Sequence, residues 1–232
     1  MSSFTFKQFH INQQHCAMKV GTDGILLGAW ADVSDCQRIL DMGTGTGLVA
    51  LMLAQRSHEH CQIEAVELDP LAAQQAQENF KASPWHNRLH LTRQDVQTYC
   101  QQTAHQFDLI VANPPYFTQG VECKNDERAL ARYVQQSHLD WLNWAASCLS
   151  KKGKISFVLP YEAGKTLINS TALYCIKQTD VITKIGKAPQ RMLLTFSREH
   201  LPQVKDSLVI YNKNNQYTEE FIALTKAFYL KM

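Results

Sequence analysis

The tetrapeptide Asn113-Pro114-Pro115-Tyr116, which follows the apolar run 107–112, has residue types suited to chemistry on a flat amino nitrogen. An exocyclic amine on a ring is a poor nucleophile because its lone pair is delocalised into the ring. The side-chain carbonyl of Asn113 and the backbone carbonyl of Pro114 could accept its two N–H bonds and localise that lone pair. Pro115 stiffens the segment, and a base stacked on the Tyr116 ring gains about 1–3 kcal/mol. The pattern predicts group transfer to nitrogen that relies on positioning rather than on a strong base.

A second chemical feature is the glycine-rich segment 41–48, which reads Asp-Met-Gly-Thr-Gly-Thr-Gly-Leu between a predicted strand and a predicted helix. Gly43, Gly45 and Gly47 allow the backbone to pass close to a ligand at the start of that helix. A dinucleotide fingerprint has the spacing G-x-G-x-x-G/A, and Leu48 stands where its last glycine or alanine belongs. Asp41 would also repel a pyrophosphate. The segment therefore predicts a nucleotide-like ligand other than a dinucleotide.

Two acidic residues end the next two predicted strands. Glu67 closes the run 63–67 and could accept hydrogen bonds from both ribose hydroxyls, a role that does not discriminate between types of cofactor. Asp95 could accept from an adenine amino group, although an Asp in this position is more often the N-cap of a helix. Their neighbours Leu68 and Val96 are included among the predicted cofactor-binding residues, and so is Asn113.

These residues are positioned by short apolar runs that alternate with helical patterns. We expect strands at 38–42, 63–67, 89–92, 107–112 and 154–159, and two further strand-like runs at 181–185 and 192–196. We expect helices at 48–56, at 70–81 with Pro70 in its first turn, at 137–149 with an end at Lys151-Lys152-Gly153, at 162–173 and at 218–229. The alternation predicts an α/β fold with a doubly wound, mostly parallel, seven-stranded sheet. We expect an N-terminal cap at 1–36 and one compact domain at 37–232.

The composition narrows the class of protein further. The 232 residues are 45% hydrophobic and 19% charged, which excludes a disordered tail, a collagen-like repeat and a highly charged coiled coil. No apolar run approaches the ~20 residues that a membrane helix needs, and no signal peptide is recognisable. The seven cysteines are never spaced as C-x-x-C, and the cluster His58-Glu59-His60-Cys61 has no second cluster to complete a metal site. We expect a cytoplasmic monomer with no membrane partner and no metal.

The net charge of +2 is unevenly distributed along the chain. Residues 1–112 hold 7 Lys and Arg against 11 Asp and Glu, a net −4, and residues 113–232 hold 16 against 10, a net +6. A polyanion would thus contact the second half. Lys124, Arg128 and Arg132 follow Tyr116 closely and could contact RNA phosphates, although each could equally lie in a solvated loop.

The pattern D-x-G-x-G-x-G with Glu67 and Asp95 at strand ends resembles the class I S-adenosylmethionine-dependent methyltransferases, which have a Rossmann-like sheet. The resemblance implies S-adenosyl-L-methionine as cofactor and S-adenosylhomocysteine as product. It also implies that the glycines pack against the cofactor, with Asp41 near its amino-acid end. The tetrapeptide at 113–116 is similar to the N-P-P-Y/F signature of methyltransferases that act on adenine N6, guanine N2 or a glutamine amide.

A third segment lies before the first strand, where residues 19–30 read K-V-G-T-D-G-I-L-L-G-A-W. It could be a buried helix with small residues for close packing, or Lys19, Thr22 and Asp23 could close over the methionine part of the cofactor. With F-x-F-K-Q-F at the start and A-F-Y-L near the end, the chain resembles a bacterial family of tRNA adenine-N6 methyltransferases. This resemblance implies methylation of adenine 37 in the anticodon loop of a valine tRNA. An RNA target should then be splayed out of its loop.

Three alternatives remain at this stage. Within the same chemistry, the acceptor could be an rRNA guanine N2 or a protein glutamine amide. A nucleotide-binding dehydrogenase is disfavoured by Leu48 and Asp41. A catalytically silent RNA-binding protein is disfavoured by the intact tetrapeptide.

Overall fold

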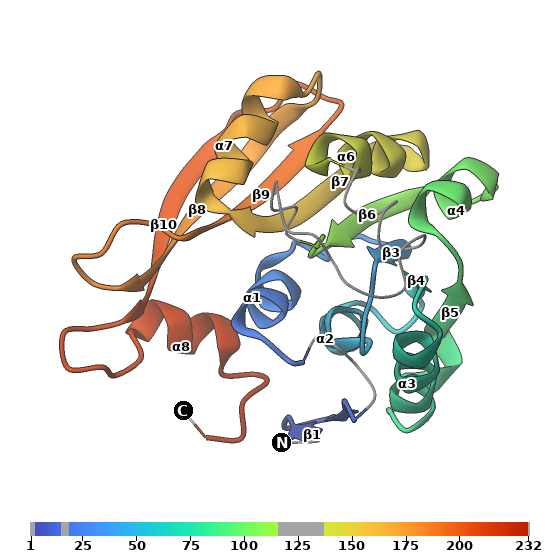
Figure 1. The fold of residues 1–232 in the computed structure, drawn as a ribbon, viewed down its shortest axis with the longest axis horizontal. Coiled ribbons are helices and arrows are strands. Elements are labelled where there is room, and N and C mark those ends of the chain that lie inside the picture. Colours follow the sequence, from blue (N-terminus) through green and yellow to red (C-terminus); the bar gives the residue numbers. More distant parts are fainter. Residues whose placement is uncertain (1–2, 15–18, 116–136, 232) are drawn as a thin grey trace, which may run out of the picture.

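The main sheet of the molecule has helices on both of its faces (Figure 1). The computed structural model describes residues 3–14, 19–115 and 137–231. Within them, eight strands form this sheet in the order β10-β8-β9-β7-β6-β3-β4-β5, and β1 and β2 form a separate hairpin. The strands are β1 (Ser3–Thr5), β2 (His10–Asn12), β3 (Arg38–Met42), β4 (Gln62–Glu67), β5 (Leu89–Arg93), β6 (Phe107–Ala112), β7 (Leu149–Pro160), β8 (Tyr174–Lys184), β9 (Arg191–Ser197) and β10 (Val204–Tyr211).

The half of the sheet that runs from β5 to β7 is parallel throughout. Met42 at the end of β3 is level with Val66 of β4 and with Ala112 of β6. The segments that follow β3, β4 and β6 therefore leave the sheet at one edge, which is where ligands bind in open α/β sheets. The other half is mixed, because β9 is antiparallel to both β7 and β8 while β10 is parallel to β8.

Two apolar layers hold the helices against the sheet, because successive strand residues face opposite sides. Ile39 of β3 belongs to the cluster that includes α1, α2, α3 and α8, and Leu40 belongs to the cluster that includes α4, α6 and α7. Figure 1 shows the two groups on opposite sides of the sheet. The helices are α1 (Thr22–Trp30), α2 (Leu48–Arg56), α3 (Pro70–Lys81), α4 (Val96–Gln102), α6 (His138–Ser147), α7 (Tyr161–Ser170) and α8 (Glu219–Thr225), with a short 3₁₀ turn η1 (His86–Arg88).

The predicted fold class is confirmed, and the sheet has one strand more than expected, since β10 extends its edge. The predicted helix end at 151–153 is wrong, because α6 ends at Ser147 and β7 begins at Leu149. A Cβ on Gly153 would lie 2.7 Å from the backbone oxygen of Phe107. Glycine there therefore lets β7 run close beside β6. The last helix is also shorter than predicted and ends at Thr225.

The N-terminal residues pack into the same core as the rest of the chain. Phe6, Phe9 and Ile11 of the hairpin region are buried in the cluster that holds α1 and α2. A Cβ on Gly28 would lie 2.8 Å from Met52, so glycine allows α1 and α2 to approach closely. This agrees with the close-packing interpretation of 19–30. The boundary between residues 36 and 37 stays a prediction.

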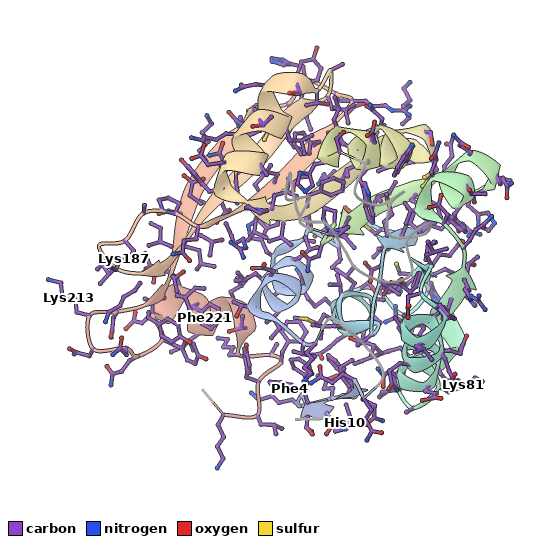
Figure 2. All side chains as sticks on the ribbon, viewed as in Figure 1. Phe4, His10, Lys81, Lys187, Lys213 and Phe221 are labelled. Atoms are coloured by element: carbon purple, nitrogen blue, oxygen red, sulfur yellow. The ribbon has the colours of Figure 1, made fainter. Side chains whose placement is uncertain are left out.

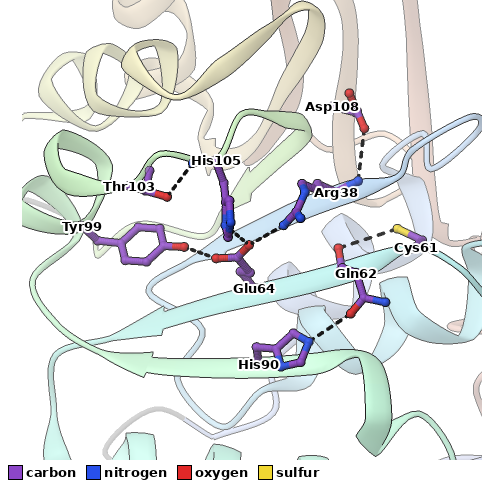
Figure 3. A network of polar contacts seen from close by, with 9 residues as sticks. All are labelled: Arg38, Cys61, Gln62, Glu64, His90, Tyr99, Thr103, His105 and Asp108. Carbon is purple, nitrogen blue, oxygen red and sulfur yellow. Dashed lines mark hydrogen bonds and ion pairs between the residues drawn. The ribbon is translucent and has the colours of Figure 1, made fainter.

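A polar network ties β3 and β4 to α4 and to the loop that follows it (Figure 3). The Glu64 carboxylate of β4 accepts from the Tyr99 hydroxyl of α4, from His105 Nδ1 at 2.7 Å and from Arg38 of β3 at 3.2 Å. Burial, then the bond to Glu64, raises the pKa of Tyr99, so its hydroxyl remains a donor. Glu64 thus joins three separate segments.

Two absences hold for the part of the chain that the structure describes. No helix there is both long enough and apolar enough to cross a bilayer. No three His, Cys, Asp or Glu side chains there gather into a set that could hold a metal ion.

Candidate active site

A cavity of about 370 Å³ lies at the edge of the sheet where β3 and β6 end. It is lined by the start of α1, by the glycine-rich segment, by the residue after β6 and by Arg191 of β9. Seven of the residues that the sequence predicts for the site line this cavity, namely Lys19, Thr22, Asp23, Asp41, Gly43, Gly45 and Asn113. The parallel sheet therefore gathers segments that are far apart in the sequence.

The three glycines of the loop have positive φ but different surroundings. Gly45 has φ +58°, lines the cavity, and a Cβ there would meet no atom within 4 Å. At Gly43 a Cβ would lie 3.0 Å from the ring of Trp141 on α6. At Gly47, with φ +84°, it would lie 2.5 Å from the ring of Phe80 on α3. Gly45 thus leaves room for a ligand, whereas Gly47 leaves room for the protein's own core.

Asp41 is a buried carboxylate in the wall of the cavity. Its Oδ2 accepts from the Thr44 hydroxyl at 2.6 Å and from the Ala50 amide at 3.0 Å, which ties β3 to the loop and to α2. Burial raises the pKa of Asp41 to about 7, the two hydrogen bonds oppose that shift, and the nearby charge of Glu67 adds to it. Near neutral pH this group can therefore change its charge when a cation binds beside it.

Asn113 presents a buried hydrogen-bond acceptor in the wall of the same cavity. Its Oδ1 is inaccessible to solvent and has no hydrogen-bond partner among the described residues. An unpaired buried polar atom costs about 1–3 kcal/mol, so its persistence points to a ligand donor. Pro114 beside it is buried, and His138 at the start of α6 bonds the backbone of Pro115. Burial lowers the pKa of His138.

Glu67 at the end of β4 bonds the glycine-rich loop, and neither it nor Asp95, two residues after β5, lines the cavity. Glu67 Oε2 accepts from the Gly45 amide at 2.8 Å, and Glu67 Oε1 accepts from the Asp69 amide at 2.9 Å. Asp95 Oδ1 accepts from the Thr98 amide at 3.1 Å and is the N-cap of α4, as its position suggested. Neither Gly47 nor the predicted cofactor residues Leu68 and Val96 belong to the lining.

Four predicted residues cannot be placed. Tyr116 and the three predicted RNA contacts, Lys124, Arg128 and Arg132, lie outside the described residues.

Arg191 lines the cavity from the start of β9, although no pattern in the sequence predicts it there. Its Nε donates to Asp23 Oδ2 at 2.9 Å, so β9 and α1 meet in an ion pair in the wall of the cavity. The sequence offers only a basic residue at the start of a strand. The pairing with a residue 168 positions earlier arises from the antiparallel return of β9, which no local pattern encodes.

The part of the chain that forms this cavity matches a known protein family. Residues 20–168 match the family described as the methyltransferase small domain, and that stretch contains the glycine loop, Asn113 and α6. The chain belongs to the methyltransferase small domain family. The lining of the cavity by the loop and by Asn113 is thus the candidate methyl-transfer site of a methyltransferase.

Two curated relatives match this methyltransferase over its whole length. The chain is 71% identical over 231 residues to a "tRNA1(Val) (adenine(37)-N6)-methyltransferase" of Haemophilus influenzae, with both chains covered completely. It is 62% identical over 230 residues to the protein of that name from Pasteurella multocida, with 99% of this chain and 97% of the relative covered.

A solved structure supports the fold of this methyltransferase. A predicted O-methyltransferase from Agrobacterium tumefaciens superposes with a TM-score of 0.70 at 18% identity, covering 89% of this chain and 96% of the other. At that identity the likeness bears on the architecture alone.

Proposed function

We propose that this methyltransferase transfers a methyl group from S-adenosylmethionine to the exocyclic N6 of adenine 37 in a valine tRNA. Two full-length relatives at 71% and 62% identity carry the name of that activity. The structural observation that carries the proposal is the buried, unpartnered Oδ1 of Asn113 in the wall of the cavity. It is an acceptor suited to the N–H of an amine.

The cavity fits a methyl donor of this kind. When bound, S-adenosylmethionine supplies a methyl group on a positively charged sulfur. Gly45 leaves open space beside its Cα, and the Asp41 carboxylate gives the wall an acidic group that suits a cationic ligand. Lys19, Thr22 and Asp23 line the same cavity and would hold the amino-acid part with Asp41.

The acids outside the lining would hold the nucleoside part of the donor, together with Leu68 and Val96. We propose that Glu67 accepts from the ribose hydroxyls with the lone pairs that the Gly45 and Asp69 amides do not use. For Asp95, whose Oδ1 caps α4, we propose Oδ2 as the acceptor for the adenine amino group. Gly43 would contact the donor, whereas Gly47 supports the loop by its contact with Phe80.

The acceptor amine would be oriented by Asn113 and Pro114. Their carbonyl oxygens take its two N–H bonds, which localises the nitrogen lone pair and makes the amine a better nucleophile. Pro115 and its bond to His138 would hold this segment in place, and Tyr116 would stack on the base. Because the amine becomes acidic once alkylated, water can take its proton, and most of the rate comes from positioning.

The RNA must present the target base outside its helical stack for the base to reach Asn113. Lys124, Arg128 and Arg132 would contact the neighbouring phosphates, consistent with the net +6 of residues 113–232. We propose that the enzyme acts in the cytoplasm, where a tRNA substrate is found. That it acts as a monomer stays a prediction.

The test uses labelled S-adenosylmethionine with separate pools of tRNA, rRNA, DNA and protein, followed by digestion of the labelled pool to nucleosides or amino acids. We expect label in tRNA as N6-methyladenosine, abolished in a valine tRNA that carries guanosine at position 37. N2-methylguanosine in rRNA or methylglutamine in protein would contradict the adenine assignment.

A further inference from the structure

A second, smaller cavity of about 150 Å³ adjoins the methyl-transfer site. Its walls come from the start of α1, from the hairpin of β8 and β9, from the end of β10 and from α8 with the segments that flank it. Thr22, Asp23 and Arg191 line both cavities. The Arg191–Asp23 ion pair, 2.9 Å between Nε and Oδ2, therefore forms part of the wall between them.

One wall of this second cavity is a ladder of aromatic rings. Tyr211 and Tyr217 stack with centroids 5.0 Å apart at 22°, and Tyr217 and Phe221 stack with centroids 4.8 Å apart at 29°. Tyr217 is 37% exposed. A hydrogen bond to the Tyr211 hydroxyl, then burial, raises the pKa of Tyr217 to about 12, so its ring is neutral. Phe221 is buried and Tyr217 stacks on both of its neighbours, so a planar base would meet the exposed edge of the Tyr217 ring, in the edge-to-face arrangement that aromatic rings favour.

The other wall carries polar groups at the mouth. The Thr183 hydroxyl donates to Gln190 Oε1 at 2.9 Å, which leaves the amide N–H groups of Gln190 as the donors that side chain can offer a ligand. Lys184 on the same hairpin donates to Asn215 at 2.6 Å, which joins the hairpin to the loop after β10. Figure 2 shows Lys187 and Lys213 on these two neighbouring loops, with Phe221 nearby. Cations beside an exposed aromatic ring suit a nucleic acid backbone.

We propose that this second cavity binds one nucleobase of the same RNA strand, a direct neighbour of the target adenine. The proposal rests on the proposed function. At about 150 Å³ against about 370 Å³ for the methyl-transfer cavity, the second cavity suits one planar ring system better than an entire S-adenosyl group. A strand that inserts its target beside Asn113 would bring the adjoining base to the far side of the Arg191–Asp23 pair, against the aromatic ladder. Gln190 would then contact an edge of that base.

The test combines protein and RNA changes in one cycle. Tyr217→Ala and Gln190→Ala are compared with wild type on tRNA and on two anticodon stem-loops, each with an abasic nucleotide on one side of adenine 37. We expect Tyr217→Ala to lower kcat/KM on intact RNA roughly tenfold, with S-adenosylhomocysteine affinity unchanged. With one of the two abasic RNAs, the kcat/KM of the wild type should fall by a similar factor. The kcat/KM of Tyr217→Ala should fall little further on that RNA.

The matched control is Tyr174→Ala. Tyr174 is an exposed tyrosine of β8 whose ring contacts His200 and does not line the cavity. This variant should leave transfer unchanged. The proposal is overturned if Tyr217→Ala lowers kcat/KM by the same factor on intact RNA and on both abasic RNAs. It is also overturned if Tyr217→Ala leaves kcat/KM unchanged. If Tyr217→Ala fails to fold, the proposal is tested by Gln190→Ala and by the wild type on the abasic RNAs. A wild-type kcat/KM that neither abasic position lowers would then overturn it. Absence of N6-methyladenosine in all wild-type reactions would instead contradict the proposed function.

Discussion

Two side chains that can accept hydrogen bonds, Asp41 of β3 and Asn113 just after β6, line the candidate site. Asp41 of β3 is level with Val111, two residues before Asn113, so the register of β3 and β6 sets their separation. Asp41 already accepts two hydrogen bonds, while Oδ1 of Asn113 accepts none from the residues that the structure describes. The first therefore supports the loop and supplies charge, and the second awaits a donor from the substrate.

The raised pKa of Asp41 predicts a pH-dependent affinity. Its carboxyl takes up a proton as the pH falls through about 7, whereas the ammonium group of S-adenosylhomocysteine favours the carboxylate. Affinity should hence fall by up to roughly eightfold from pH 7.5 to pH 6, as calorimetry can measure. Asp41→Asn should bind more weakly at pH 7.5 and show a flat profile. A wild-type profile equally flat would contradict this role.

The glycines predict two separable defects. Gly47→Ala combines a left-handed backbone with a contact against Phe80, so we expect a loss of about 2–5 kcal/mol in urea unfolding. Gly45→Ala has only the backbone strain, about 1–2 kcal/mol, but places a methyl group at the cavity and should weaken S-adenosylhomocysteine binding. Equal losses of stability and of affinity in both variants would refute this division.

The sequence could identify the glycine pattern but not this division of roles. All three glycines read alike as ligand contacts in the pattern G-x-G-x-G. The contact of Gly47 with Phe80 joins residues 33 positions apart, and it depends on how α3 packs beside the loop. For the same reason the pattern did not reveal Arg191, which reaches the site from β9.

The network around Glu64 acts at the level of secondary-structure elements. Removing its carboxylate in Glu64→Ala leaves the buried Tyr99 hydroxyl without its acceptor, whereas Arg38 and His105 are about half exposed and can turn to water. We expect a loss of about 1–3 kcal/mol in urea unfolding. Glu59→Ala, which removes a 79% exposed carboxylate, is the control and should change stability by less than about 0.5 kcal/mol. Equal effects would show that the network adds no stability.

Elements with strong local signals were predictable from the sequence. Residues 38–42, 48–56 and 107–112 have the predicted bounds, because each is a continuous apolar run or helix between glycines, Asn-Pro or polar residues. β10 was missed because its first four residues are exposed and polar apart from Val204, so only 208–211 carry an apolar pattern. The extended β7 was missed because Lys151-Lys152-Gly153 resembles a helix end, and its strand pairing with β6 is a tertiary effect.

Charge is the property of the whole molecule that bears most on RNA binding. The net −4 of residues 1–112 and +6 of residues 113–232 predict that phosphate contacts come from the second part of the chain. If Lys124, Arg128 and Arg132 each neutralise one phosphate, tRNA affinity should fall roughly twentyfold between about 50 and about 200 mM salt. Filter binding measures this, and S-adenosylhomocysteine affinity is the control that should stay nearly constant. A tRNA affinity that does not respond to salt would exclude these contacts.

Methyl transfer and donor binding, both measured in Asn113→Ala, separate the acceptor role of Asn113 from any role in holding the donor. Because Oδ1 of Asn113 is the acceptor for the target amine, we predict at least about a hundredfold loss of transfer to tRNA while S-adenosylhomocysteine affinity stays within about twofold of wild type. Asn113→Asp, which keeps an acceptor oxygen, should recover part of the activity. Unchanged transfer, or equal losses of transfer and donor affinity, would contradict the account.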